Sequence, residues 1–345
     1  MNPSTISRVV VTGATGNVGT SLVRVLAREP RVGSVLGLAR RRPGLEIPGV
    51  KWAEVDLSRE EDEPQLARYV AEADAVVHLA WRFGPTHDPL ETWRTNVLGA
   101  VRVFDAVAAA RVPVLVHASS VGAYSPGPVG GTPVSEAWPT HGWPGAAYTR
   151  EKAYLERVLD TFERDHPLIR VVRMRPAFLF KEESASGQRR VFAGRFFPGQ
   201  LMRPDLLPLL PEFKGLRFQA LHTEDAAEAY LRALLRDVRG AFNLAAEPVI
   251  DAAALGELLN ARPVRVPAGA VRGALSAAWR LRLAQASPGL FDALRQMPLL
   301  ATERARRELE WEPSRSSLDA LEAFLRGVRA GAGDDTGPLA GHRIG

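Results

Sequence analysis

Residues 9–26 read VVVTGATGNVGTSLVRVL, and this stretch decides the fold. An apolar run ends in a turn with three glycines, and an amphipathic run with helical spacing follows it. A strand, a turn and a helix in this order bring backbone N–H groups and a helix N-terminus to one point, which favours a bound diphosphate. We expect Gly13 to allow the tight turn, Gly16 the close approach of a phosphate, and Gly19 the packing of helix on strand. The GxxGxxG spacing is not specific by itself, so an ordinary strand–turn–helix is the alternative.

Apolar and amphipathic runs alternate through the first half of the chain. The expected strands after the first are 34–39, 51–55, 75–80, 112–118 and 169–174, and the longest expected helices are 90–110 and 148–164. This alternation predicts an α/β fold, a Rossmann-type doubly wound parallel sheet with a smaller C-terminal substrate-binding subdomain. Ligands of such sheets bind at the carboxyl ends of the strands.

The pattern also divides the chain. Residues 1–176 are expected to form the NAD(P)-binding Rossmann domain, completed by about residues 221–245. Residues 177–220, with several prolines and no clean period, and residues 246–330, which read as mostly helical, are expected to form the substrate-binding lid subdomain. Residues 331–345 are rich in glycine and polar residues, so we expect a disordered tail.

Composition excludes several classes of function. The chain has 345 residues and no cysteine, so we expect no disulfide, no thiolate nucleophile and no thiolate metal site. We see no signal peptide and no run of 18 apolar residues, which predicts a cytoplasmic protein without a membrane partner. The net charge of +5 comes mostly from scattered arginines without interleaved aromatic residues, so we expect no nucleic-acid partner.

Two charged residues follow predicted strands at places where a dinucleotide is read. Arg40 ends the second strand, with no Asp or Glu beside it. An acidic residue there binds the 2′-hydroxyl of the adenosine ribose, whereas an arginine suits a 2′-phosphate, so the sequence favours NADP slightly over NAD. The alternative is an exposed turn arginine. Asp56 follows the third strand and can accept from the adenine amino group, or cap the helix that begins near Arg59.

Three hydroxyl and amine side chains suit hydride and proton chemistry at a carbonyl. Tyr148 and Lys152 lie four residues apart on one helix face, and Ser120 ends a strand before them. We expect Lys152 and a nicotinamide cation to lower the pKa of Tyr148, so that Tyr148 exchanges a proton with the substrate oxygen that Ser120 polarises. Lys152 would also hydrogen-bond the nicotinamide ribose. Many Tyr-x-x-x-Lys pairs are only helix-surface neighbours, so the prediction depends on their occurrence together with the glycine turn and Ser120.

These motifs, in this order, resemble the extended short-chain dehydrogenase/reductase superfamily, in its NAD-dependent epimerase/dehydratase branch. The matching stretches, over about residues 1–330, include TGATGNVG at 12–19, TNVLGA at 95–100, HASSVGAY at 117–124, YTREK at 148–152 and LHTEDAAEA at 221–229. The resemblance implies that Ser120, Tyr148 and Lys152 are catalytic. It implies these cofactor contacts: Gly13, Gly16, Asn17, Val18, Gly19, Asp56, Leu57, Leu79, Ala80, Asn96, Tyr148, Lys152, Pro176 and Ala177.

Departures from the family pattern narrow the chemistry. Val121 and Gly122 follow Ser120 where sugar-nucleotide 4,6-dehydratases have an Asp-Glu pair, and Phe178 and Phe218 replace an asparagine and an arginine of the sugar-nucleotide epimerases. We therefore predict an NAD(P)-dependent oxidoreductase that acts on a small-molecule secondary alcohol or ketone. The alternatives are a sugar-nucleotide epimerase with tightly bound NAD and, less favoured, a non-catalytic NADP-sensing protein.

The remaining expectations concern the substrate side and assembly. Five phenylalanines suggest either an apolar pocket or the core of the lid: Phe178, Phe180, Phe196, Phe197 and Phe218. Three tryptophans on loops after strands are candidate substrate contacts: Trp81, Trp138 and Trp143. We expect His222 to be structural rather than catalytic. A homodimer through the helices at 90–110 and 148–164 is possible by the same resemblance.

Overall fold

A computed structural model describes residues 5–83, 87–192, 208–284 and 286–340. Its centre is a seven-stranded sheet in which every neighbouring pair of strands is parallel. The strands in spatial order are β3 (Val50–Glu54), β2 (Val32–Ala39), β1 (Ile6–Thr12), β4 (Ala75–His78), β5 (Val114–Ala118), β6 (Arg170–Pro176) and β11 (Gly240–Leu244). The predicted Rossmann-type α/β fold is confirmed.

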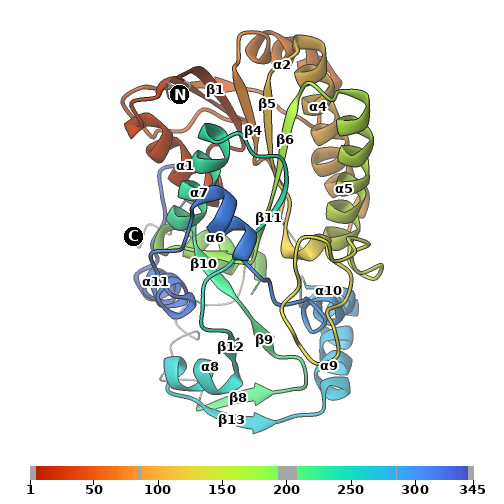
Figure 1. The fold of residues 1–345 in the computed structure, drawn as a ribbon. Helices are drawn as coiled ribbons and strands as arrows, with labels where there is room; N and C mark the ends of the chain where they lie inside the picture. Colours follow the sequence, from red (N-terminus) through yellow and green to blue (C-terminus); the bar gives the residue numbers. More distant parts are fainter. Residues whose placement is uncertain (1–4, 84–86, 193–207, 285, 341–345) are drawn as a thin grey trace.

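Helices cover both faces of this sheet (Figure 1). One layer consists of α1 (Asn17–Arg28) and α7 (Thr223–Leu235), and the other of α2 (Glu63–Val70), α4 (Gly99–Ala110) and α5 (Ala147–Asp165). Strands buried on both faces are almost continuously apolar, which explains runs such as Val9–Val11 and Ala75–Val77, all fully buried. Because β1 lies between β2 and β4, the chain changes direction across the sheet at β1, and a crevice opens at its carboxyl end.

The helix expected at 90–110 is divided in three. Asp88 caps α3 (Pro89–Trp93) by accepting from Leu90 N at 3.0 Å. A π-helical segment, Arg94–Leu98, follows α3 and leads directly into α4. π-helical turns shift the side chains that follow them around the helix axis. Here the segment directs the buried Asn96 towards α5, where it meets Glu151.

The part of the molecule expected to bind substrate, residues 177–220 and 246–330, is here called the substrate side, and it contains three two-stranded sheets with β10 (Ala220–His222) at its border. They pair β7 (Phe178–Phe180) with β10, β9 (Arg217–Phe218) with β12 (Ile250–Asp251), and β8 (Leu209–Glu212) with β13 (Arg262–Arg265). The helices of this side are α6 (Ala185–Phe192), α8 (Ala252–Leu259), α9 (Ala268–Arg280), α10 (Pro288–Leu294) and α11 (Ser317–Ala330). Strands β12 and β13 lie in a stretch whose sequence pattern predicts mostly helix. The pattern does not indicate these strands, because β9 and β8, which pair with them, are distant in the chain.

The expectation of a disordered tail is wrong for residues 331–340. Thr336 and Leu339 are only 3% and 4% exposed. Thr336 Oγ1 donates to the carbonyl oxygen of Thr15 at 2.9 Å, a contact across 321 residues of sequence. Composition suggested disorder because it cannot show burial against so distant a segment; the expectation for residues 341–345 lies outside the described residues. None of the helices within the described ranges is long and apolar enough to cross a membrane.

Candidate active site

A cavity of about 710 Å³ lies at the carboxyl ends of the central strands. This volume is within the range of small-molecule and cofactor sites. The predicted site residues that line it are Gly13, Gly16, Asn17, Val18, Gly19, Arg40, Asp56, Leu57, Leu79, Ala80, Ser120, Tyr148, Lys152, Pro176 and Ala177. Residues far apart in the sequence are therefore brought to one place. No group of three His, Asp or Glu side chains suited to a metal ion occurs within the described ranges.

The glycine turn is shaped by close backbone approaches. Gly13 has φ +67°, and a Cβ there would lie 2.6 Å from the Ala80 Cα. A Cβ on Gly19 would lie 2.2 Å from the Gly13 carbonyl oxygen. Gly16 is the N-cap of α1 and makes no side-chain cap hydrogen bond. Asn17 Oδ1 is buried without a partner in the described part of the chain. An uncapped helix N-terminus and an unsatisfied buried acceptor fit a bound group that carries phosphates and hydroxyls.

Arg40 and Asp56 lie at the other end of the cavity. The Arg40 side chain is exposed at the rim, beside Arg41. Asp56 does not cap the next helix: its Oδ1 accepts from Ser58 N at 3.0 Å and from Ser58 Oγ at 2.7 Å. Burial by itself would raise the pKa of Asp56, but the Ser58 hydrogen bonds and the charges of Arg40 and Arg59 lower it. Asp56 is therefore an ionised acceptor at the cavity wall.

Tyr148 and Ser120 form a direct pair. Tyr148 Oη donates to Ser120 Oγ at 2.7 Å, and Gly122 N donates to the same oxygen at 3.0 Å. Since Ser120 Oγ accepts two hydrogen bonds, its own proton is left to donate into the cavity. Trp81 and Phe83 pack edge-on against the Tyr148 ring, with centroid distances of 5.8 and 5.1 Å. The pair thus has one polar side and one apolar side.

The pKa of Tyr148 differs from the expectation. Burial raises it to about 12, and the hydrogen bond to Ser120 only partly offsets this. Lys152 is not among the causes of this pKa shift; its Nζ donates to the Ala118 carbonyl oxygen at 2.7 Å and lies 3.5 Å from the Trp81 ring centroid. Burial also lowers the pKa of Lys152 to about 7, against the charges of Glu156 and Glu151. The expected lowering by Lys152 is therefore wrong for the protein's own groups.

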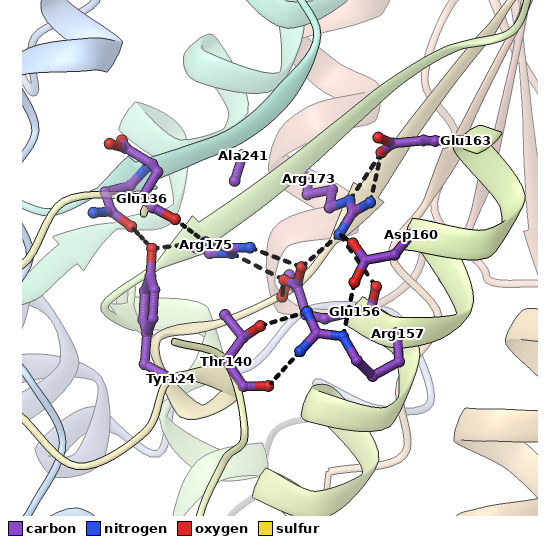
Figure 2. A network of polar contacts seen from close by, with 12 residues as sticks. Tyr124, Glu136, Thr140, Glu156, Arg157, Asp160, Glu163, Arg173, Arg175 and Ala241 are labelled. Carbon is purple, nitrogen blue, oxygen red and sulfur yellow. Dashed lines mark hydrogen bonds and ion pairs between the residues drawn. The ribbon is translucent and has the colours of Figure 1, made fainter. Parts of the chain in front are cut away.

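An ion network centred on the buried Glu156 adjoins Ser119, the residue before Ser120; Figure 2 shows Glu156 with Arg173 and Arg175. Glu156, 1% exposed, accepts from Arg175 Nη2 at 2.8 Å, from Arg173 Nη1 at 3.0 Å and from Ser119 Oγ at 2.5 Å. Arg175 Nη1 also donates to Tyr124 Oη at 2.9 Å. The network ties α5 and β6 to the residue that precedes Ser120, so it fixes the end of β5. The sequence gives no sign of this role, because Arg173 and Arg175 lie in a strand and their carboxylate partner Glu156 lies in the preceding helix.

Asn96 lies behind the cavity wall rather than on it; its neighbour Thr95 lines the cavity. Asn96 Oδ1 accepts from Arg82 N at 2.7 Å, and Asn96 Nδ2 donates to Glu151 Oε2 at 2.8 Å. It therefore joins the loop after β4 to α5, next to Lys152. Glu151 was missed because a charged residue at this place in a helix usually faces solvent.

The cavity has an apolar wall beside Tyr148, of which the sequence indicated Trp81 alone. It is formed by Trp81, Phe83, Val121, Leu290, Leu294 and Met297. Phe178 and Phe180 also line the cavity, yet Phe178 packs on Phe218 at 5.3 Å between ring centroids. These phenylalanines thus serve both as wall and as core, whereas Phe196 and Phe197 lie outside the described residues.

The other aromatic candidates have structural positions. Trp138 Nε1 donates to the Pro126 carbonyl oxygen at 3.2 Å, and the Trp143 carbonyl oxygen accepts from Thr149 Oγ1 at 2.7 Å. Neither tryptophan lines the cavity. His222 Nδ1 accepts from Glu224 N at 3.3 Å and caps α7, as expected for a structural residue.

The chain is similar to known proteins both in sequence and in fold. The model of the NAD dependent epimerase/dehydratase family matches residues 9–245. An uncharacterized protein of Mycobacterium tuberculosis is 26% identical over 336 residues, which covers 92% of this chain and 83% of that protein. The UDP-glucose 4-epimerase of Thermotoga maritima, solved with UDP-glucose, has a TM-score of 0.72 at 18% identity and covers 94% of this chain and 99% of its own. The UDP-glucose 4-epimerase of Thermus thermophilus, solved with NAD, has a TM-score of 0.67 at 20% identity, covering 93% and 99%. At these identities the solved structures demonstrate a shared fold.

Proposed function

Because the chain belongs to the NAD dependent epimerase/dehydratase family of extended short-chain dehydrogenases/reductases, we propose that it is an NAD(P)-dependent oxidoreductase acting at a secondary alcohol or ketone carbon. The observation that carries this proposal is the 2.7 Å hydrogen bond between Tyr148 and Ser120, in the cavity that also contains the glycine turn and Lys152. Proton donors beside a dinucleotide-type phosphate turn are what carbonyl reduction requires.

The residues at the strand ends suit a nicotinamide dinucleotide. The turn from Gly13 to Gly19 would hold the diphosphate, Asp56 and Leu57 the adenine, and Lys152 the nicotinamide ribose. When bound, the nicotinamide supplies or accepts the hydride. Arg40 and Arg41 line the cavity, and no Asp or Glu stands beside them in the sequence at the end of β2, which supports NADP over NAD.

The chain's own residues handle the proton. Ser120 directs its free proton to the substrate oxygen and polarises the carbonyl. Tyr148, with a pKa of about 12, is protonated at neutral pH and donates its proton to that oxygen during reduction. The resulting phenolate regains a proton from solvent. In alcohol oxidation the same proton transfers occur in the opposite direction.

The apolar wall supports an apolar substrate. Leu290 and Leu294 from α10, with Met297, face the side of the cavity that holds Tyr148. A hydrocarbon or aromatic group on the ketone would bury apolar area against them, worth about 25 cal/mol per Å². The second candidate, a sugar-nucleotide epimerase, is favoured by one observation: the solved UDP-glucose 4-epimerases share this fold.

One experiment separates the candidates. The dinucleotide that co-purifies is identified by mass spectrometry, and the protein is then assayed for NADPH and NADH oxidation with apolar ketones and for UDP-glucose to UDP-galactose conversion. We expect NADPH consumption with apolar ketones, lost in Tyr148→Phe although that variant still binds NADPH. Tightly held NAD with sugar conversion and no net redox would support the epimerase. A melting temperature that neither dinucleotide changes would contradict both.

The same helices that the resemblance assigns to a homodimer carry exposed apolar side chains. Leu90, Leu98 and Tyr154 are 66%, 40% and 46% exposed, on α3, the π-helical segment and α5. We propose that this face is the interface. Light scattering should find a dimer that Leu98→Arg shifts towards the monomer, whereas a monomeric unaltered protein would contradict the proposal.

A further inference from the structure

The chain beyond α11 turns back towards the glycine turn. Helix α11 ends at Gly331, whose φ of 63° is left-handed and therefore suits glycine. Ala332 N donates to the Gly327 carbonyl oxygen at 2.8 Å, which closes the helix end. Figure 1 shows α11 on the same side of the molecule as α1 and α7. The next residues, 332–340, are here called the C-terminal strap.

Two contacts anchor the strap to the first βα unit. Thr336 Oγ1 donates to the Thr15 carbonyl oxygen at 2.9 Å, within the glycine turn itself. Asp334 Oδ2 and Arg24 Nη2 of α1 form an ion pair at 2.9 Å. The strap is also closed on itself, because Leu339 N donates to the Thr336 carbonyl oxygen at 3.2 Å. It is therefore an ordered loop held against the phosphate turn.

The strap forms part of the cavity wall. Gly337, Pro338 and Leu339 line the same cavity as Gly16 and Arg41. The fit is close on both sides: a Cβ on Gly337 would lie 2.6 Å from Arg41 Nη2, and a Cβ on Gly187 of α6 would lie 2.7 Å from the Pro338 carbonyl oxygen. The cavity keeps about 710 Å³ with the strap in place, so the strap is a wall and not a plug.

We propose that residues 332–340 are part of the cofactor site and retain the dinucleotide by covering its diphosphate half. This inference rests on the proposed function. A ligand behind an ordered wall leaves only when the wall moves, so the strap slows dissociation more than it alters association. Residues 332–340 lie outside both the glycine turn and the group formed by Ser120, Tyr148 and Lys152.

The test compares the full chain with a chain that ends at Gly331. NADPH is bound to each protein, and its dissociation is followed by stopped-flow fluorescence during displacement with excess NADP⁺. We expect the shortened chain to release NADPH about tenfold faster, with a similar association rate. Thr336→Val, which loses the bond to Thr15, should accelerate release about threefold. The control Thr132→Val changes an exposed threonine elsewhere and should behave as the unaltered protein.

The outcomes of the release experiment distinguish failure of the strap proposal from failure of the proposed function. Equal NADPH release rates from the full and the shortened chain would overturn the proposed role of the strap and leave the proposed function unaffected. Faster association with tighter binding in the shortened chain would instead show that the strap inhibits cofactor binding. If the full chain binds neither NADPH nor NADH, the proposed function fails and the strap with it. Should the shortened chain not fold, Leu339→Ser, at a side chain 4% exposed, replaces it: unchanged release in that variant and in Thr336→Val would overturn the proposal.

Discussion

The seven-stranded sheet and the substrate side of the molecule are built in different ways. In the sheet, each strand pairs with parallel neighbours, and the residues that line the cavity follow a strand end directly, as Gly13 follows β1. On the substrate side, short strands pair in twos, and the cavity wall comes from helix α10 and a loop that have no local motif. Under the proposed function, chemistry would therefore depend on the sheet side, at positions that short motifs mark, and selectivity on the substrate side, through packing between distant segments.

The largest expected effect separates chemistry from selectivity. Ser120→Ala removes the donor to the substrate oxygen and should lower kcat about 10²–10³-fold, the usual cost of one such donor. KM and NADPH binding should change little, because in the proposed mechanism the reacting oxygen is the only substrate atom that Ser120 contacts. Steady-state kinetics with an apolar ketone and NADPH fluorescence measure both. A variant with full turnover would place the chemistry elsewhere.

The second effect compares a buried ion network with an exposed pair. Glu156→Gln leaves Arg173 and Arg175 without their shared carboxylate and should lower the free energy of unfolding by about 3–5 kcal/mol. On the substrate side, Asp292→Asn breaks the pair with Arg272, which is half exposed, and should cost less than about 1 kcal/mol. Urea unfolding at pH 7 measures both variants. Equal losses of unfolding free energy in the two variants would contradict the expected difference between the buried network and the exposed pair.

The pH dependence of the same network has a definite sign. Burial by itself would raise the pKa of Glu156, but the Arg175 hydrogen bonds and the charges of Arg175 and Arg173 lower it from 4.5 to about 2. A lowered carboxyl pKa stabilises the protein fully above the unfolded value of 4.5, and this contribution is lost as the pH falls towards 2. The difference in stability between the unaltered protein and Glu156→Gln should therefore narrow below pH 4.5, and a constant difference would contradict this origin.

A smaller effect is expected on the substrate side. Leu294→Ala removes part of the apolar wall and should raise KM for apolar ketones about tenfold, with kcat unchanged. Leu281→Ala is the matched control, since Leu281 is 68% exposed and outside the cavity. A fall in kcat with KM unchanged would show that this side takes part in chemistry.

An effect of similar size concerns the choice of dinucleotide. Arg40→Ala should lower the preference for NADPH over NADH by about tenfold, the loss of roughly one charged contact. Arg42→Ala is the control, because Arg42 is exposed and does not line the cavity. The ratio of dissociation constants for the two dinucleotides measures the change. An unchanged ratio of dissociation constants would show that Arg40 is an exposed turn residue without a role in the choice of dinucleotide.

Much of the site could be predicted because its parts are local. The turn from Gly13 to Gly19 depends on three glycines at fixed spacing, and the four-residue spacing of Tyr148 and Lys152 places both on one helix face. The direction of the Tyr148 pKa could not be predicted, because burial by Trp81 and Phe83 outweighs a neighbour in the sequence. The resemblance implies a cofactor contact for Asn96, yet its motif gives no sign of the π-helical segment that directs it to Glu151, behind the cavity wall.

The doubly wound sheet, the glycine turn, Ser120 after β5 and the helical spacing of Tyr148 and Lys152 can be inferred from the sequence, since hydrophobic period and short motif spacing act within one strand–helix unit. What closes the cavity depends on the tertiary structure. Leu294 and Leu339 reach it from segments that follow the last strand of the sheet, and the Thr336–Thr15 contact spans 321 residues. Such contacts depend on burial and on pairing between distant segments, for which no neighbouring residue in the chain provides a signal.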